Sequence, residues 1–155
     1  MNRHNCRHQA GVGLIEVLIA VLVLSIGFLG IAALQARSLS MNNSSMARSV
    51  ATIDSYSILD AMRADLASAR GNAYDGTVKA NACPTDTSTL ANTQIMQWCG
   101  QLAAGLGASA STTGTIKCTG IQGDCTITVT FDDSKSKSAA SDTTGTQTVV
   151  TRAML

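Results

Sequence analysis

The chain has 155 residues, a formal net charge of +1, 45% hydrophobic residues and only 3% aromatic residues. This length suits one modest globular domain with an additional element, and the near-neutral charge gives no indication of a nucleic-acid-binding surface. The shortage of aromatic residues favours a helix rich in Ala, Val, Ile and Leu over a large aromatic core.

Residues 1–11 form a short basic leader. They include two arginines and both of the chain's histidines but no acidic residue, whereas residues 12–155 carry nine Lys or Arg against ten Asp or Glu. Removal of this leader would therefore leave a protein that has no histidine and a slight excess of negative charge.

From Val12 to Leu34 the chain is almost entirely apolar, interrupted only by Glu16, Ser25 and small residues. This run has 23 residues, and a helix needs about 20 to cross the hydrocarbon core of a bilayer. An ordinary signal peptide has a shorter apolar region, about 7–15 residues, followed by an Ala-x-Ala-like cleavage site, and no such site follows directly. The pattern predicts a membrane-inserted helix over residues 12–34.

Charge and cysteine placement indicate how the chain crosses the membrane. The positive-inside rule keeps the basic leader in the cytoplasm, so we expect a single pass through the inner membrane with the C-terminal part in the periplasm. Cys6 stands apart near the N-terminus. The other four cysteines form an even set, as expected for disulfides in an oxidising compartment: Cys83, Cys99, Cys118 and Cys125.

An amphipathic helical pattern follows the apolar run. Its apolar residues recur mainly at three- and four-residue steps: Met46, Val50, Ile53, Leu59, Met62 and Leu66. The charged residues are expected on the other surface: Asp54, Asp60, Arg63 and Asp65. Because no proline precedes Pro84, the helix is predicted to run from about Gly13 to Ala69 and to end at Gly71-Asn72. Residues 35–70 would then be an amphipathic continuation of the span.

Residues 71–155 are predicted to form a periplasmic globular head. Residues 71–88 are predicted to be a loop, 90–106 a second amphipathic helix, and 132–146 a polar loop. Strands are predicted over 115–118, 125–131 and 147–155, and the middle strand alternates apolar residues with threonine, so that one of its faces is expected to be buried.

The most informative stretch is Gly11-Val12-Gly13-Leu14-Ile15-Glu16. It resembles the prepilin signature, a Gly-Phe-Thr-Leu-Ile-Glu box after a short basic leader, with Val12 and Gly13 in place of the usual Phe and Thr. The resemblance implies that a prepilin peptidase cleaves between Gly11 and Val12. It also implies that Val12 becomes N-methylated and that Glu16, now fifth in the mature chain, pairs with the N-terminus of a neighbouring subunit.

The physical chemistry of Glu16 agrees with that role. A carboxylate inside a membrane span costs several kcal/mol unless it is paired, and cleavage after Gly11 would create an ammonium group on Val12 near the same depth. Glu16 is the only glutamate of the chain. Pairing with the ammonium group of its own chain, one helical turn away, and snorkelling of the carboxylate to the membrane interface are the two alternatives.

The resemblance extends beyond the box. Residues 16–39 (EVLIAVLVLSIGFLGIAALQARSL) are similar to PilV-type minor pilins, and so are residues 60–75 and, more loosely, the head with its Trp98 helix and Cys125–Phe131 strand. The apolar half of the helix also lacks the kinking proline that is usual in major pilins. The resemblance implies an α+β, type IV pilin-like fold, in which a long N-terminal helix packs on a small disulfide-bonded antiparallel-sheet head.

The implied function is assembly and priming of a type IV pilus, with other minor pilins and the major pilin as partners. Twitching motility, adhesion or DNA uptake would follow from it. Two alternatives stay open at this point. One is a minor pseudopilin of type II secretion, and the other, of a different class, is a membrane-anchored periplasmic binding module whose span is not cleaved.

The head cysteines and the acidic residues near the end of the chain each have a metal-binding alternative. The four cysteines contain no Cys-x₂-Cys pair, so disulfides are favoured over a zinc site, and pairing of sequence neighbours is preferred because each pair closes a local loop. Asp132, Asp133 and Asp142 suggest calcium, but a solvated loop is the preferred interpretation.

Sequence features of an enzyme are missing. The mature chain would lack histidine, the most common general base, and Gly-x-Ser-x-Gly does not occur. There is no phosphate-binding glycine loop, so neither an enzymatic activity nor a cofactor is expected.

Overall fold

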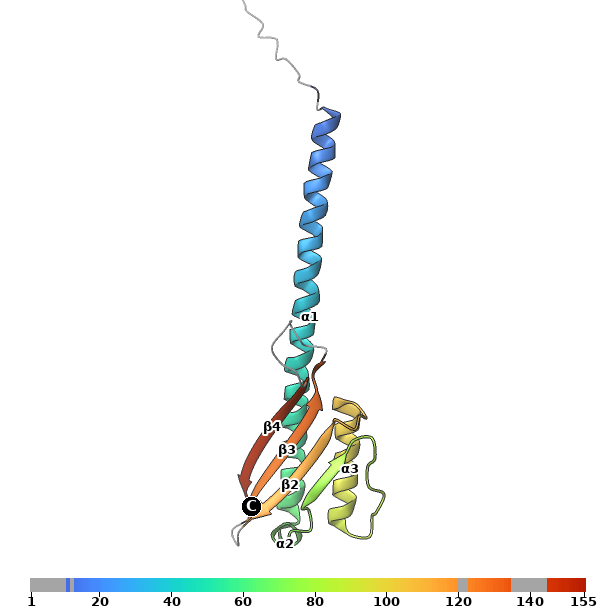
Figure 1. Cartoon of the computed structure of the whole chain (residues 1–155). Helices are drawn as coiled ribbons and strands as arrows, with labels where there is room; N and C mark the ends of the chain where they lie inside the picture. Colours follow the sequence, from blue (N-terminus) through green and yellow to red (C-terminus); the bar gives the residue numbers. More distant parts are fainter. Residues whose placement is uncertain (1–10, 12, 120–122, 135–144) are drawn as a thin grey trace, which may run out of the picture. The chain divides into compact units, whose positions relative to one another are not determined.

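The computed structural model describes residues 11, 13–119, 123–134 and 145–155. The chain divides into two compact units, Met1–Leu39 and Ser40–Leu155. Helix α1 (Leu14–Ala64) contributes its first part to the first unit and its second part to the second. The other elements follow in chain order, and all except β1 are labelled in Figure 1: α2 (Leu66–Arg70), β1 (Gly76–Lys79), α3 (Leu90–Leu106), β2 (Thr113–Thr119), β3 (Asp124–Asp132) and β4 (Thr146–Met154).

In the first unit, every described residue from position 13 to 39 is exposed. The sequence is a good helix former because Leu, Ala, Val and Ile follow one another without proline. Ser25, a polar residue within this run, donates its hydroxyl proton to the carbonyl oxygen of Val21, at 2.7 Å. This hydroxyl is therefore satisfied inside the helix and needs no partner from outside.

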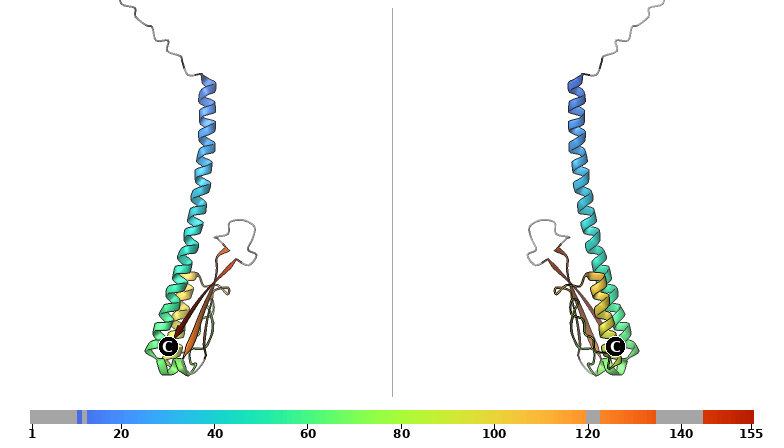
Figure 2. Two further views of the ribbon diagram at one scale, coloured as in Figure 1. Left: turned by 90° about the vertical axis from the view of Figure 1, so that its left-hand side faces the viewer. Right: turned by 90° about the vertical axis from the view of Figure 1, so that its right-hand side faces the viewer.

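The second unit is a two-layer α+β head. Its sheet is antiparallel with the order β1-β2-β3-β4. Figure 2 shows the second part of α1 and helix α3 together on one face of this sheet. The alternation in β3 explains the layering, because Ile127, Val129 and Phe131 are buried toward the helices while the threonines between them lie on the other face. This α+β, disulfide-bonded, type IV pilin-like fold confirms the predicted fold class.

The inner face of α1 within the head differs from the predicted one. Ala51, Ile58, Leu59 and Met62 are buried, whereas Met46 and Ile53, which were expected to face the core, are 67% and 65% exposed. Asp54 was placed on the polar surface by its charge, yet it is only 8% exposed. The helical period was right and Leu59 and Met62 are buried as predicted, but the buried face is rotated toward the small residues Ala51 and Ser55. The partners that cover this face are not visible in a local pattern.

The predicted continuous helix to Ala69 is interrupted at Asp65. This residue has φ −123° and ψ 57°, so α1 ends at Ala64 and the short helix α2 follows. The carboxylate of Asp65 accepts hydrogen bonds from Ser68 Oγ at 2.8 Å and from Tyr74 Oη at 3.3 Å. Tyr74 is fully buried and also bonds Gln94 of α3, so the break is held by contacts with residues that follow it in the chain.

Strand β1 lies in the segment predicted to be a loop. Gly76–Lys79 pairs with β2, with Thr77 opposite Thr115 and their hydroxyl groups 2.9 Å apart. Its composition is that of a turn, so only pairing with a partner distant in sequence makes it a strand. β2 and β3 are present but longer than predicted, β4 has the predicted length but lies one residue earlier, and α3 has the predicted bounds. Thr89 caps its start by accepting from the Asn92 amide at 3.1 Å.

The helix–sheet interface is tightest where Gly114 of β2 meets α3. A Cβ atom at Gly114 would come within 2.7 Å of Leu102 and would also collide with the ring of Trp98. Trp98 is buried, and its indole Nε1 donates to the backbone carbonyl oxygen of Asp54 at 3.0 Å. One side chain of α3 thus joins β2 and α1, and glycine is required for this approach.

Candidate functional site

The candidate functional site begins where α1 begins. The carbonyl oxygen of Gly13 accepts hydrogen bonds from the amides of Glu16 at 3.0 Å and Val17 at 3.4 Å, so Gly13 stands at the N-cap position and Glu16 in the first turn. Gly11 is exposed, with open space around its Cα. Val12, the rest of the leader and Cys6 lie outside the described residues, so the proposed cleavage junction is described only on the Gly11 side.

The geometry adds a local role for Glu16 that sequence reasoning missed. A carboxylate three residues after the N-cap interacts favourably with the unpaired amides and the positive end of the helix. A signal for this was available in the sequence, because an acidic residue in the first turn after a glycine is a helix-start pattern. Glu16 is exposed within the described part of the chain, so its carboxylate is open to a group from another molecule.

The surface that follows Glu16 is apolar on all sides and is not covered by the described part of the chain. Among the described residues, α1 is the one helix long and apolar enough to cross a membrane, and none of its most apolar window is buried. Leu14, Phe28 and Leu29, for example, are 83%, 63% and 72% exposed. The core helix of a soluble protein would be covered by its own domain, so this surface needs lipid or other helices as its environment. An apolar helix of this kind fits a membrane-anchored subunit.

The four head cysteines form two disulfides. Cys83, in the segment after β1, is bonded to Cys99 of α3, and Cys118 of β2 is bonded to Cys125 of β3. These are the pairs of sequence neighbours preferred from the spacing. The sulfur atoms are therefore not available as metal ligands, and within the described ranges no group of three or more His, Cys, Asp or Glu is placed to hold a metal ion.

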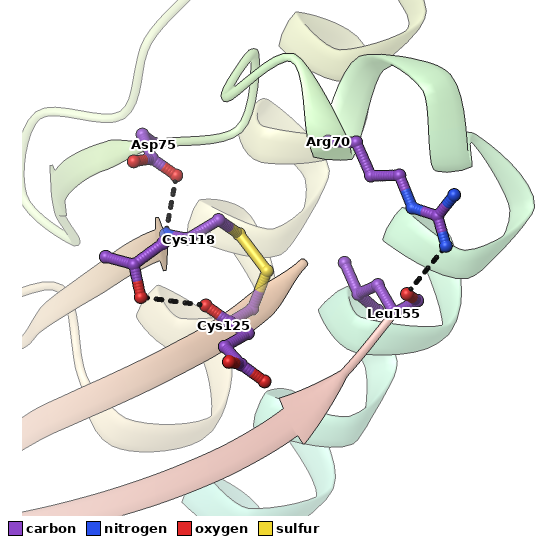
Figure 3. The surroundings of a disulfide bond; sticks show 7 residues. Arg70, Asp75, Cys118, Cys125 and Leu155 are labelled. Atoms are coloured by element: carbon purple, nitrogen blue, oxygen red, sulfur yellow. Dashed lines mark hydrogen bonds between the residues drawn. A yellow bond between two sulfur atoms is a disulfide. The ribbon is translucent and has the colours of Figure 1, made fainter. Parts of the chain in front are cut away.

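Figure 3 shows the surroundings of the second disulfide. Cys118 and Cys125 are direct partners in the β2–β3 register, and the Cys118 amide also donates to a carboxylate oxygen of Asp75 at 2.9 Å. Nearby, Arg70 of α2 donates to the carbonyl oxygen of Leu155 at 3.0 Å. The disulfide thus lies at the end of the sheet where α2 and the residue after β4 also meet.

The acidic residues considered for calcium have other partners. Asp132 accepts from the Ser134 amide at 2.8 Å, and Asp133 accepts from Ser44 Oγ of α1 at 2.5 Å. Asp142 lies outside the described residues. The described carboxylates therefore serve a local turn and a contact between helix and sheet.

Comparison with known proteins identifies the N-terminal part of the chain. Residues 6–32 match the family model described as the prokaryotic N-terminal methylation motif. A search of curated proteins and a search of solved structures each found no match. The matched residues include the Gly11–Glu16 box and most of the apolar run, and such a motif is typical of a structural subunit rather than an enzyme. The chain thus carries the N-terminal motif of type IV pilins and pseudopilins on a type IV pilin-like α+β fold.

Proposed function

We propose that this protein is a minor pilin that takes part in the assembly and priming of a type IV pilus. The observation that carries the proposal is the N-terminal methylation motif on a helix whose apolar surface is left uncovered by the described part of the chain. In the inner membrane, lipid covers this surface. After assembly, the helices of other minor pilins and of the major pilin cover it instead, so one surface serves both environments.

The proposed path starts with a precursor that crosses the inner membrane once, with its leader in the cytoplasm and its head in the periplasm. Prepilin peptidase cleaves between Gly11 and Val12, and Val12 is then methylated. The new ammonium group is a cation of the kind that a carboxylate at membrane depth requires. Glu16 of one subunit pairs with the N-terminus of a neighbour, which restricts assembly to cleaved subunits and sets their stagger.

The assignment to the PilV type rests on the similarity of residues 16–39 and on the missing proline in the apolar half of α1. The head supports a periplasmic location, because its four cysteines form two disulfides and such bonds persist in oxidising compartments. Pseudopilins of type II secretion share the N-terminal motif. Measuring both pilus number and type II secretion in a strain without this protein separates the two functions, and we expect only piliation to fall.

Cleavage is the step that distinguishes this proposal from a membrane-anchored binding module. We expect N-terminal sequencing of the protein from the producing cell to begin at Val12, and mass spectrometry to show a methyl group on it. Gly11→Leu should leave an uncleaved precursor in the inner membrane because the peptidase requires the small residue. The matched control, Gly27→Leu, lies within the span and should be cleaved normally. Normal maturation of Gly11→Leu would overturn the proposal.

A further inference from the structure

The edge of the sheet formed by β4 has no partner within the described part of the chain. All nine residues of β4 pair with β3 in an unbroken register, from Asp132 opposite Thr146 to Asp124 opposite Met154. The sheet order places β4 at one end, and Figure 1 shows it as the outermost strand. An edge strand leaves alternate backbone groups without a partner, and these form a template for another strand.

The hydrogen bonds beyond both ends of β4 show which backbone groups are free. The Leu155 amide donates to Gly123 at 3.1 Å, and Gly145 accepts from the Asp133 amide at 2.6 Å. Both bonds continue the β3–β4 register, and hydrogen-bonded pairs alternate with non-bonded pairs in an antiparallel ladder. The odd-numbered residues of β4 therefore bond to β3, and the even-numbered residues direct their amide and carbonyl groups to the open edge. These five residues are Thr146, Thr148, Val150, Arg152 and Met154.

The two edges of the sheet are protected differently. β1 has only four residues, and Lys79 forms an isolated bridge with Ala82, so the chain itself folds against that edge. β4 is more than twice as long, contains no proline, and has a single charged residue, Arg152. Short strands, prolines, bulges and charges are the usual means of blocking an edge. Of these, β4 has only the charge of Arg152.

Side chains beside the β4 edge are also incompletely covered. On the helix side of the sheet, Val149 and Ala153 pack against the core but are only partly buried. On the other side, Val150 and Met154 are 53% and 64% exposed. One additional strand beside β4 would cover apolar side chains on both faces and satisfy the free backbone groups in the same step.

The direction of β4 limits what that strand can be. Arg48 of α1 donates to Gln147 at the start of β4, at 2.6 Å, and Arg70 of α2 donates to Leu155 just after its end. β4 therefore runs in the same direction as residues 48–70 of the helical layer. In the proposed function, every subunit crosses the membrane with its leader in the cytoplasm and its head in the periplasm, so neighbouring helices are parallel, and the inference rests on that arrangement.

A second copy of this chain fits the β4 edge poorly. Antiparallel pairing of β4 with β4 of the copy would reverse one of the two helices. Parallel pairing of the same two strands would place the two helix layers on opposite faces of the joined sheet. The remaining edge strand of the copy, β1, does run in the opposite direction, but it is short and its edge is occupied at Lys79 by the bridge to Ala82.

We infer that β4 accepts a strand from a different pilin-type subunit. This strand runs antiparallel to β4, carries apolar side chains on the helix side next to Val149 and Ala153, and continues the sheet of the head. The interaction joins two unlike heads with parallel helices, so it selects a specific neighbour in addition to the contacts of the apolar helices.

The test uses the full mature chain in detergent, with the other pilin-type subunits of the same cell purified and added one at a time. The probe is amide hydrogen exchange in β4. We expect one of these subunits to slow exchange at Thr148, Val150 and Arg152 by about tenfold or more, and this chain added to itself at the same concentration to leave exchange unchanged. Slowing by this chain alone, or by none of the subunits, would overturn the inference.

Two variants test whether the slowed amide exchange comes from a strand bound at the β4 edge. Val150→Pro removes an outward amide but no hydrogen bond to β3, and Val150→Lys places a charge on the edge. Either should abolish the slowing. The control Thr128→Lys puts the same charge on β3, directly opposite Val150. Exchange in this control should still be slowed by the partner subunit. Retained slowing in both Val150 variants, with unchanged melting temperatures, would contradict the inference.

Cleavage of the precursor is measured separately. A subunit that is cleaved normally but binds no strand at β4 would contradict the inference and leave the proposed function standing.

Discussion

At the scale of single residues, Asp54 is the least ordinary group in the head. Its side chain is buried, and its Oδ2 atom has no hydrogen-bond partner among the described residues. Burial raises the pKa of this carboxyl above its ordinary value of 3.8, because the charged form loses its hydration. The contribution of this group to stability is fully present below pH 3.8 and is lost as the pH rises through the higher pKa of the folded state.

We therefore predict that Asp54→Asn makes the head less sensitive to pH. The amide has nearly the same shape and no charge to desolvate, so the free energy of unfolding of the variant should rise relative to that of the parent between pH 4 and neutral pH. Denaturant unfolding followed by Trp98 fluorescence across this range is the measurement. The control Asp60→Asn only breaks an exposed ion pair with Arg63, which is worth less than about 1 kcal/mol. Parallel pH profiles of parent and Asp54→Asn would contradict this account.

A second prediction concerns the contact of Gly114 with α3. Gly114→Ala should lower the free energy of unfolding by about 1–3 kcal/mol, since a methyl group must displace Leu102 or the Trp98 ring in a packed core. Gly100→Ala is the matched control: no atom lies within 4 Å of the added methyl group, and replacing glycine within a helix stabilises by up to about 1 kcal/mol. Thermal melts should shift in opposite directions, and equal melting temperatures for the two variants would refute the packing argument.

At the scale of elements, the two disulfides connect different parts of the head. Cys118–Cys125 fastens β2 to β3 across a connection of seven residues, and Cys83–Cys99 ties the segment after β1 to α3 across sixteen. A disulfide stabilises the folded state chiefly by reducing the conformational entropy of the unfolded chain, and the effect is larger when the bond closes a longer loop. The segment carrying Cys83 has little regular structure of its own, so its position depends on this bond.

We predict that replacing Cys83 and Cys99 together by alanine costs about 3 kcal/mol, and that replacing Cys118 and Cys125 together costs about 2 kcal/mol. Unfolding of each double variant by denaturant provides both values. Mass mapping of non-reduced peptides from the parent should find the same two bonds, with Cys6 in neither. A linkage between Cys83 and either Cys118 or Cys125 would refute the pairing, whereas four free thiols would contradict the periplasmic location.

At the scale of the whole molecule, the uncovered apolar part of α1 determines the environment of the protein, and Glu16 is the charged group within it. If the carboxylate pairs with the N-terminus of a neighbour, Glu16→Ala and Glu16→Gln should both be inserted and cleaved but should fail to assemble. Glutamine retains the hydrogen-bonding role at the helix start and loses only the charge, so its failure would identify charge pairing as the cause.

The readout for Glu16 is the number of pili per cell, with cleavage and membrane level measured in the same cells. Ser25→Ala is the control, because the Ser25 hydroxyl is bonded within its own helix and its loss should not affect assembly. Normal piliation by both Glu16 variants would show that the carboxylate serves only the helix start or the membrane interface. The pairing mechanism would then be wrong, while the N-terminal motif would remain.

Several elements of this protein follow from the sequence by itself, because their signals are local. The apolar run from Val12 to Leu34 needs only its length and composition to predict a helix without cover from its own chain. Helix α3 has the predicted bounds and buries one face, and Gly107 follows its last residue. Strand β3 alternates so regularly that its buried face could be named in advance, and the even set of four cysteines in the head indicated two disulfides.

Other features were decided only by the tertiary structure. Turn-like residues Gly76–Lys79 become a strand because β2 offers a hydrogen-bonding partner about 40 residues further along the chain. Asp65 interrupts the helix because Tyr74 and Ser68 bind its carboxylate. Asp54 is buried because it lies on the same face of α1 as Ala51, Ile58 and Met62, and this face packs into the core. A local pattern reports the period of an element, but the face that is buried depends on the partners that reach it.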